Sequence, residues 1–307
     1  MRAAFIKALV EIARQDRRIL LLTGDLGYLV VEPFLESFPE RFINVGVAEQ
    51  NMVGIATGLA EAGFIPFVYS IAPFAALRPF EFIRNGPIYH QLPVRIVGVG
   101  QGVDYGFNGH SHFGVDDIGV LRTQPGLTII APADDAQTRT AVEISRDVAG
   151  PIYFRLGKDS FEIPDLSRPF ELGQTQQIGL GKDVLLVSSG AITREAIKAA
   201  DILRQRGIES TILVIASIAP APVADLLEAL SSFKQVFTIE SHYITGGIGS
   251  LIAEIVAEHR LDVQVLRLGF DSILNGVLGS PAFLHDAHGL SAEKIAIQIG
   301  HHLRINV

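Results

Sequence analysis

A single glutamate stands at the start of a strongly apolar helical pattern early in the chain. Residues 47–52 read Val-Ala-Glu-Gln-Asn-Met, and the apolar spacing continues through Ile55 and Leu59. Acidic side chains in a first helical turn are favoured by the helix dipole, so Glu49 could be an ordinary helix cap. It could instead be a carboxylate held for proton transfer, because a dry setting raises a carboxyl pKa. Taken alone, the segment favours the cap.

A glycine-punctuated loop at residues 106–112 follows an apolar run that predicts a strand. The loop contains Asn108, His110 and His112. Open α/β sheets bind ligands in loops at the carboxyl ends of their parallel strands. The two histidines could be acid–base groups, metal ligands or surface residues. Because one His-x-His pair without an evident third ligand is weak evidence for a metal, we expect no metal site in this chain.

A third segment, residues 70–74, joins another predicted strand to a helix. It places Ile71 and Phe74 at the junction. A phenylalanine at such a junction usually belongs to the core. Its ring could instead stack on a flat heterocycle, a contact that adds about 0.5–1.5 kcal/mol beyond burial, by analogy with aromatic pairs. The core interpretation is favoured until the other motifs are counted.

The elements that must position these side chains alternate along most of the chain. Continuous Val, Ile and Leu runs alternate with helical patterns, which predicts parallel sheets covered by helices on both faces. We predict an α/β fold with two doubly wound, mostly parallel-sheet domains, residues 1–160 and a smaller unit at 183–307, joined by a linker at 161–182. The expected strands are residues 19–23, 42–45, 65–69, 95–99, 128–131, 152–155, 183–188, 210–216, 235–240 and 263–268.

The composition restricts the class of protein. The 307 residues are 48% hydrophobic and 19% charged, which is typical of a globular chain. The net charge of −8 argues against nucleic-acid binding, which needs a concentrated basic face. The absence of cysteine excludes disulfides and thiolate catalysis and fits a cytoplasmic protein. The first residues have amphipathic helical spacing, and no apolar run reaches the roughly 18 residues of a membrane span.

Taken together, these segments resemble the C-terminal half of transketolase, a thiamine diphosphate enzyme, over nearly the whole chain. Residues 47–52 match the family's (I/V)AEQNM, Phe74 falls on the aromatic residue of its F-x-x-F stretch, and residues 109–112 fall on G-x-(S/T)-H. Each match is weak alone, but together they follow the family order, which is specific. The further matches are residues 78–85 (R-x-x-D-Q-I-R-N), 116–122 (E-D-I-x-x-L-R), 132–134 (P-A-D), 217–220 (S-I-K-P) and 240–247 (E-E-H…G-G).

For the cofactor, the resemblance implies that Glu49 hydrogen-bonds N1′ of the aminopyrimidine and so promotes cofactor activation. Phe74 would stack on the same ring, and Ile71 would contact the cofactor. Full-length transketolases also carry an N-terminal domain whose Gly-Asp-Gly…Asn motif binds the diphosphate with Mg²⁺, and this chain contains no such motif. The resemblance therefore implies a split enzyme. Its separate N-terminal subunit would carry the diphosphate and magnesium site, in a heterotetramer with each cofactor at a subunit interface.

For the substrate, the resemblance implies transfer of a two-carbon ketol unit from a ketose donor to an aldose acceptor. His112 would hydrogen-bond the sugar hydroxyls or the developing oxyanion, and Asn108, His110 and Lys158 would complete the substrate contacts. Three positions depart from the family: an acidic residue is Asn108, a phosphate-contacting histidine falls on Gly100, and a phosphate-binding arginine falls on Lys158. Because lysine lacks arginine's bidentate fork, we expect a sugar other than the usual pentose phosphates.

Three other interpretations stay open. The β-subunit of a 2-oxo acid dehydrogenase shares the two domains and a catalytic glutamate, although the Ala-Glu-Gln-Asn segment and the Gly-x-Ser-His loop favour transketolase. A reaction like that of 1-deoxyxylulose-phosphate synthase is compatible with the motifs, but that enzyme is normally one long chain. A non-catalytic assembly subunit is the third, and it needs none of Glu49, Phe74 and His112.

Overall fold

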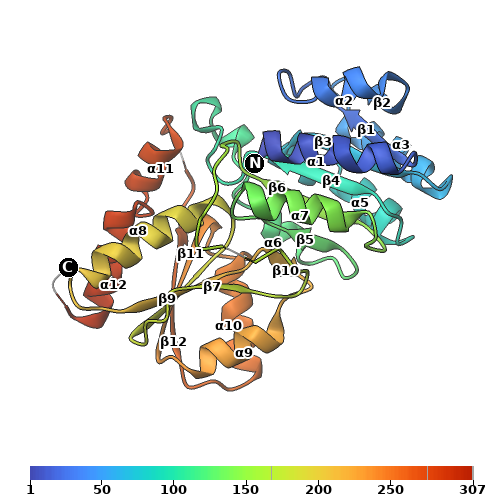
Figure 1. Cartoon of the computed structure of the whole chain (residues 1–307). Helices are drawn as coiled ribbons and strands as arrows, with labels where there is room; N and C mark the ends of the chain where they lie inside the picture. Colours follow the sequence, from blue (N-terminus) through green and yellow to red (C-terminus); the bar gives the residue numbers. More distant parts are fainter. Residues whose placement is uncertain (167, 275, 306–307) are drawn as a thin grey trace.

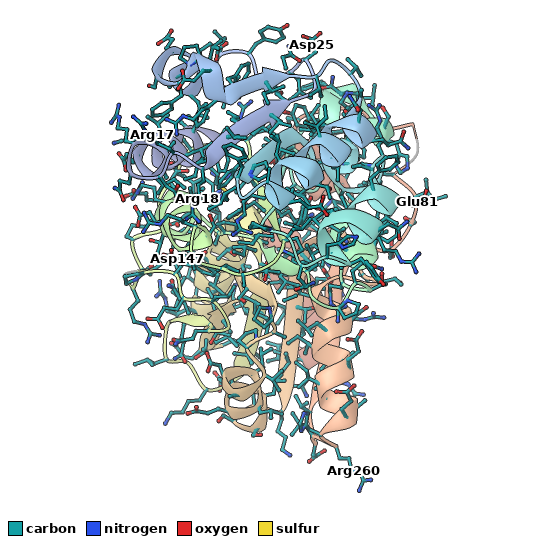
Figure 2. All side chains as sticks on the ribbon, turned by 90° about the vertical axis from the view of Figure 1, so that its right-hand side faces the viewer. Arg17, Arg18, Asp25, Glu81, Asp147 and Arg260 are labelled. Carbon is teal, nitrogen blue, oxygen red and sulfur yellow. The ribbon has the colours of Figure 1, made fainter. Side chains whose placement is uncertain are left out.

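The computed structural model describes residues 1–166, 168–274 and 276–305, which form two α/β domains (Figure 1). Each domain has a mostly parallel sheet with helices on both faces, so the predicted fold class is confirmed. Figure 2 shows Asp25 and Arg260 at opposite ends of the molecule. Asp25 lies in a loop of the first domain, and Arg260 follows a helix of the second domain. The two domains are therefore stacked end to end.

The first domain is a sheet between two helical layers. Its elements are α1 (Arg2–Gln15), β1 (Ile19–Thr23), α2 (Glu32–Ser37), β2 (Phe42–Asn44), α3 (Glu49–Glu61), β3 (Ile65–Ile71), α4 (Ala72–Ala76), α5 (Phe80–Ile83), β4 (Arg95–Val99), α6 (Asp117–Leu121), β5 (Thr128–Ile130), α7 (Asp135–Ser145) and β6 (Ile152–Leu156). Within the described residues the strand order is β5-β6-β4-β3-β1-β2, all parallel. Strands β1, β4 and β6 are buried along their whole length, which explains their continuous apolar runs.

Two hydrophobic layers hold the helices against this sheet. Helices α1 and α7 cover one face, where Phe5 of α1 packs with Leu21 of β1. Helices α3, α4 and α6 cover the other face, where Met52 of α3 packs with Leu22 of β1. Neighbouring residues of one strand thus serve opposite layers, because strand side chains alternate between faces. Each such aliphatic side chain contributes about 1.5–3 kcal/mol when fully buried.

The second domain repeats the arrangement on a smaller sheet. Its elements are β7 (Gln176–Ile178), β8 (Val184–Ser188), α8 (Thr193–Arg204), β9 (Ser210–Val214), β10 (Ser217–Ala219), α9 (Val223–Ser231), β11 (Gln235–Tyr243), α10 (Ile248–Glu258), β12 (Gln264–Phe270), α11 (Pro281–Ala287) and α12 (Ala292–Leu303). In the part of the chain that the structure describes, the strand order is β12-β11-β8-β9-β7. Helices α8 and α12 pack on one face, and α9 and α10 on the other.

Two short strands fall outside the predicted elements. Strand β7 lies inside the predicted linker 161–182 and pairs antiparallel with β9 at the edge of the second sheet. Strand β10 follows β9 along the chain but crosses to the first sheet, where it pairs antiparallel with β5 and covers that edge. Both lack the apolar run that marks the equally short β2 and β5, since β7 reads Gln-Gln-Ile and β10 reads Ser-Ile-Ala. The domain boundaries at residues 160 and 183 stay predictions, and the predicted last residue, 307, lies outside the described residues.

Candidate functional site

The carboxyl ends of β1 and β3 form the topological switch point of the first sheet. Strand β2 lies on one side of β1, and β3 and β4 continue on the other side. Ligands of open α/β sheets bind in the crevice outside such a point. Gly24, Glu49 and Ser70 meet there: a Cβ on Gly24 would stand 3.9 Å from Glu49 Oε1, and Ser70 Oγ donates to the same oxygen at 3.4 Å. The fold therefore places the predicted carboxylate at its most favourable ligand position.

Glu49 is the first residue of α3, and its side chain is only 4% exposed. Its carboxylate is directed toward Ser70 and Arg78, and Nη1 of Arg78 lies 3.2 Å from both carboxylate oxygens. A buried carboxylate needs such a partner, because an unpaired charge in the interior is costly. The helix begins at Glu49, but its carboxylate makes contacts across the crevice instead of capping the helix.

Phe74 forms a flat surface beside this carboxylate. It lies in α4, directly after the end of β3 at Ile71, and both residues are half-buried. The guanidinium carbon of Arg78 lies over the Phe74 ring, 3.8 Å from the ring centroid. The structure therefore contradicts the core interpretation of Phe74. One face of the ring is covered by the planar guanidinium of Arg78, whose Nη1 reaches Glu49.

His112 packs edge-on against the Phe74 ring, with the two ring centroids 5.0 Å apart. It ends a short helical turn, His110–His112, that starts after Gly109, whose φ of +80° favours glycine. Partial burial, together with the positive charge of Arg78, lowers the pKa of His112. A neutral imidazole of this kind can accept or donate a proton at a bound ligand.

Glu49, Arg78, Phe74 and His112 thus form a row of contacts. This row continues from His112 to Lys158 through Tyr105. The rings of His112 and Tyr105 are 6.2 Å apart, and Lys158 Nζ lies 4.4 Å from the Tyr105 centroid. The backbone N–H of Lys158 donates to Asp104 at 3.0 Å, and burial raises the pKa of that carboxyl to about 6. Nε of Arg2 donates to the Lys158 carbonyl at 3.3 Å. Two cations, Arg2 and Lys158, thus stand together at this end of the row.

The structure brings together most, but not all, of the predicted site residues. Asn108 and His110 are exposed, and His110 packs edge-on against Phe113 instead of joining the row. Lys158 also lines a groove of about 660 Å³ between α1 and α2, which continues the cationic end of the row. The predicted residues in the row or at its edge are Glu49, Ile71, Phe74, His112 and Lys158.

Sequence reasoning missed three residues of this row. Arg78 lies in a segment that is matched only through the family resemblance, and its contact with Glu49 has no local signal. Tyr105 lies in a glycine-rich loop, where an aromatic residue could have been recognised as a candidate. Arg2 is separated from Lys158 by most of the first domain, so no spacing pattern connects them.

The described residues contain no cluster of three or more His, Asp or Glu side chains that could hold a metal ion. Nor does any helix in the described ranges have the length and apolar character needed to cross a membrane.

A buried polar network lies behind the row, between the two domains. The Asp117 carboxylate accepts from Arg155 Nε at 2.9 Å and from the Tyr153 hydroxyl at 2.7 Å. Nη2 of Arg155 donates to the carbonyl of Gly114 at 2.6 Å and to that of Ser241, in β11, at 3.0 Å. Arg155 therefore connects the end of the His112 loop to the second domain.

Comparison with known proteins identifies the family of this chain. The family model of the transketolase pyrimidine-binding domain matches residues 1–163, and that of the transketolase C-terminal domain matches residues 173–295. The chain is 35% identical to a protein of Methanocaldococcus jannaschii named as a transketolase C-terminal section, over 97% of this chain and 95% of that protein. It is 34% identical to one of the subunits of the apulose-4-phosphate transketolase of Phocaeicola vulgatus, over 96% and 94% of the two chains. A solved structure described as a split gene transketolase, inactive β4 tetramer, is 34% identical, with a TM-score of 0.89 over 100% of this chain and 99% of that one. The chain therefore belongs to the transketolase family.

Proposed function

We propose that the chain is the pyrimidine-binding and C-terminal subunit of a split, thiamine diphosphate-dependent transketolase. It transfers a two-carbon ketol unit from a ketose donor to an aldose acceptor. The observation that carries the proposal is the row of contacts from Glu49 through Phe74 and His112 to Lys158. One end suits a flat hydrogen-bonding ring, and the other end suits an anionic sugar.

The residues present fit the aminopyrimidine of thiamine diphosphate. A planar cation already lies on Phe74 while it donates to Glu49, so there is room for a flat donor in that position. When bound, the cofactor supplies the electron sink for cleavage and formation of carbon–carbon bonds. Glu49 would hydrogen-bond ring N1′ by sharing a proton between its carboxyl group and that nitrogen, Phe74 would stack on the ring and Ile71 would pack at its edge.

On the substrate side, we assign proton transfer at the sugar hydroxyls to His112, whose lowered pKa keeps the imidazole neutral near pH 7. Asn108 and His110, which are exposed on the same loop, contact the sugar from outside the row, and Lys158 with Arg2 binds its anionic end. The relative named for apulose-4-phosphate supports an anionic sugar. The sequence departures at Asn108 and Lys158 support a sugar other than the usual pentose phosphates.

For assembly, we propose a heterotetramer with a separate N-terminal subunit that holds the diphosphate and provides the Mg²⁺ ligands. The similar solved structure is described as an inactive β4 tetramer, which supports a need for a second kind of subunit. Glu49 lies at the open carboxyl edge of the sheet, where such a subunit can cover the cofactor.

The experiment is co-expression of the chain with a candidate N-terminal subunit. Calorimetry with Mg²⁺ measures thiamine diphosphate binding, and coupled assays measure ketol transfer from phosphorylated and unphosphorylated ketoses. We expect Glu49→Gln to lower turnover by about 10²–10⁴-fold with assembly intact. Glu61→Gln, at the exposed end of α3, is the matched control and is expected to retain activity.

Unchanged turnover in the Glu49 variant would leave the chain only an assembly role. Full preference for pentose phosphates would contradict the proposed substrate class but not the reaction.

A further inference from the structure

Arg78 lies where the proposed function places the aminopyrimidine ring. Its guanidinium carbon is 3.8 Å from the Phe74 centroid, and Nη1 is 3.2 Å from each carboxylate oxygen of Glu49. A guanidinium is planar, stacks on aromatic faces and donates to carboxylates. It therefore makes the same two contacts as a flat heterocyclic donor. Arg78 and the cofactor ring cannot both use the Phe74 face and the Glu49 carboxylate.

We propose that Arg78 is an internal occupant of the cofactor site, which must swing outward before the aminopyrimidine binds. This inference rests on the proposed function. The physical reason for the occupant is the Glu49 carboxylate, which is 4% exposed and would otherwise be a buried charge without an ionic partner. Arg78 supplies the partner in the cofactor-free chain, and the incoming ring replaces it by sharing a proton between N1′ and the Glu49 carboxyl.

The surroundings of Arg78 permit this movement in the side chain alone. The side chain is 47% exposed, so an outward rotamer exchanges protein contacts for water. Its carbonyl accepts from Gln50 Nε2 at 3.3 Å, and Pro79 follows with a fixed φ, so the backbone is held. Glu81, on the next helix, is also exposed, and Figure 2 shows it at the surface of the molecule. The displaced guanidinium therefore has an open, solvated side to enter.

The occupant lowers the apparent cofactor affinity of the lone chain. A ligand that binds only the outward conformer has an apparent Kd equal to its intrinsic Kd divided by the population of that conformer. The Arg78 side chain therefore acts as a regulatory gate. Because the gate opposes binding, the cofactor binds tightly only where further contacts, such as those to the diphosphate in an assembled enzyme, supply additional affinity.

Thiamine tests the gate in this chain, because it carries the aminopyrimidine but lacks the diphosphate and so requires no magnesium site. Calorimetry of the full chain compares wild type, Arg78→Gln and the control Arg84→Gln, an exposed arginine just after α5. We expect thiamine to bind Arg78→Gln about tenfold more tightly than wild type, equivalent to about 1.4 kcal/mol. The Arg84 variant should bind like wild type.

Equal or weaker binding by Arg78→Gln would overturn the gate and leave the proposed function standing. Failure of all three proteins to bind thiamine would overturn the gate, because removing Arg78 would then not open the site, whereas the proposed function is decided separately by cofactor binding in the co-expressed complex.

A second readout gives the direction of the movement. Phenylglyoxal modifies accessible arginines, and mass spectrometry locates the modified positions. Saturating thiamine should increase modification of Arg78 and leave Arg84 unchanged. Protection of Arg78 by thiamine would overturn the gate, because it would make Arg78 a ligand of the bound ring.

Discussion

At the scale of single residues, the Phe74 ring contacts both the guanidinium of Arg78 and the imidazole of His112. Arg78 lies over its face, and the His112 ring packs against it in a T-shaped arrangement. Partial burial and the charge of Arg78 both disfavour the imidazolium form of His112. The geometry thus keeps the histidine neutral while the carboxylate of Glu49 is paired.

The first prediction concerns this coupling. Replacing Arg78 with glutamine should raise the pKa of His112, because the nearby positive charge is removed while the burial remains. An NMR titration of the histidine ring resonances measures the change, with Arg84→Gln as the control that should leave His112 unaffected. An identical His112 titration in wild type and the Arg78 variant would contradict the contact.

The second prediction concerns the cationic end of the row. Lys158→Gln should raise KM for a phosphorylated ketose about tenfold or more, because a hydrogen bond to a charged group contributes about 1.5–3 kcal/mol. Turnover at saturation should change little, since Lys158 lies far along the row from Glu49. Steady-state kinetics of the assembled enzyme test this, and KM for a neutral ketose should be unaffected. Equal KM changes for both sugars would exclude anion recognition by Lys158.

At the scale of elements, the N-terminus of α7 connects the first sheet to the segment that follows it. Asp134 is fully buried, and its carboxylate accepts from the N–H of Gln137 at 2.8 Å and from the N–H of Ile163 at 2.9 Å. The first contact is a helix N-cap, and the second holds the chain just after β6. One side chain therefore fixes both the helix and the start of the connection to the second domain.

The third prediction follows from this double contact. Asp134→Ala should lower the free energy of unfolding by about 2–3 kcal/mol, because it removes a cap and leaves a buried N–H without an acceptor. Urea denaturation measures the loss. Asp147→Ala is the control: this residue lies beyond the other end of α7, is 75% exposed and is labelled at the surface in Figure 2. The control should stay within about 0.5 kcal/mol of wild type, and equal losses in both variants would refute the capping argument.

At the scale of the whole molecule, buried titratable groups lie between the two domains. His242, in β11 of the second domain, is fully buried beside Asp117 and Arg155 of the first, and its Nε2 accepts from the Gly119 N–H at 3.2 Å. Burial lowers the pKa of His242 from 6.5 to about 4. The domain interface therefore requires a neutral imidazole.

The fourth prediction is a pH dependence of stability that arises at this interface. Between about pH 6.5 and pH 4 the unfolded chain binds a proton at His242 that the folded chain does not, so unfolding becomes easier as pH falls. His242→Asn lacks this proton uptake. Its stability should therefore fall less than that of wild type between pH 7 and pH 5, by about 2 kcal/mol. Urea titrations at both pH values test this, with the exposed His259→Asn as control. Parallel pH profiles for wild type and His242→Asn would disprove the contribution.

Local pattern was sufficient to predict much of the molecule. Buried strands such as β1 and β4 show continuous apolar runs because helices cover both of their faces. The helix that begins at Glu49 shows an apolar stripe because one of its faces packs against the sheet. The motif at Glu49 and the loop at His112 were recognisable because a site needs particular residue types at short, fixed spacings. The fold class and the family therefore followed from the residues.

Contacts between distant segments depended on the tertiary structure. The crossing of β10 to the first sheet, the position of Arg78 against Glu49 and the approach of Arg2 to Lys158 have no signal in local spacing. Periodicity reports whether a side chain is buried, but not which distant strand or loop covers it. That choice is made by the order of strands in the sheets, which places the carboxyl ends of β1 and β3 side by side and so brings Glu49, Phe74 and Arg78 together.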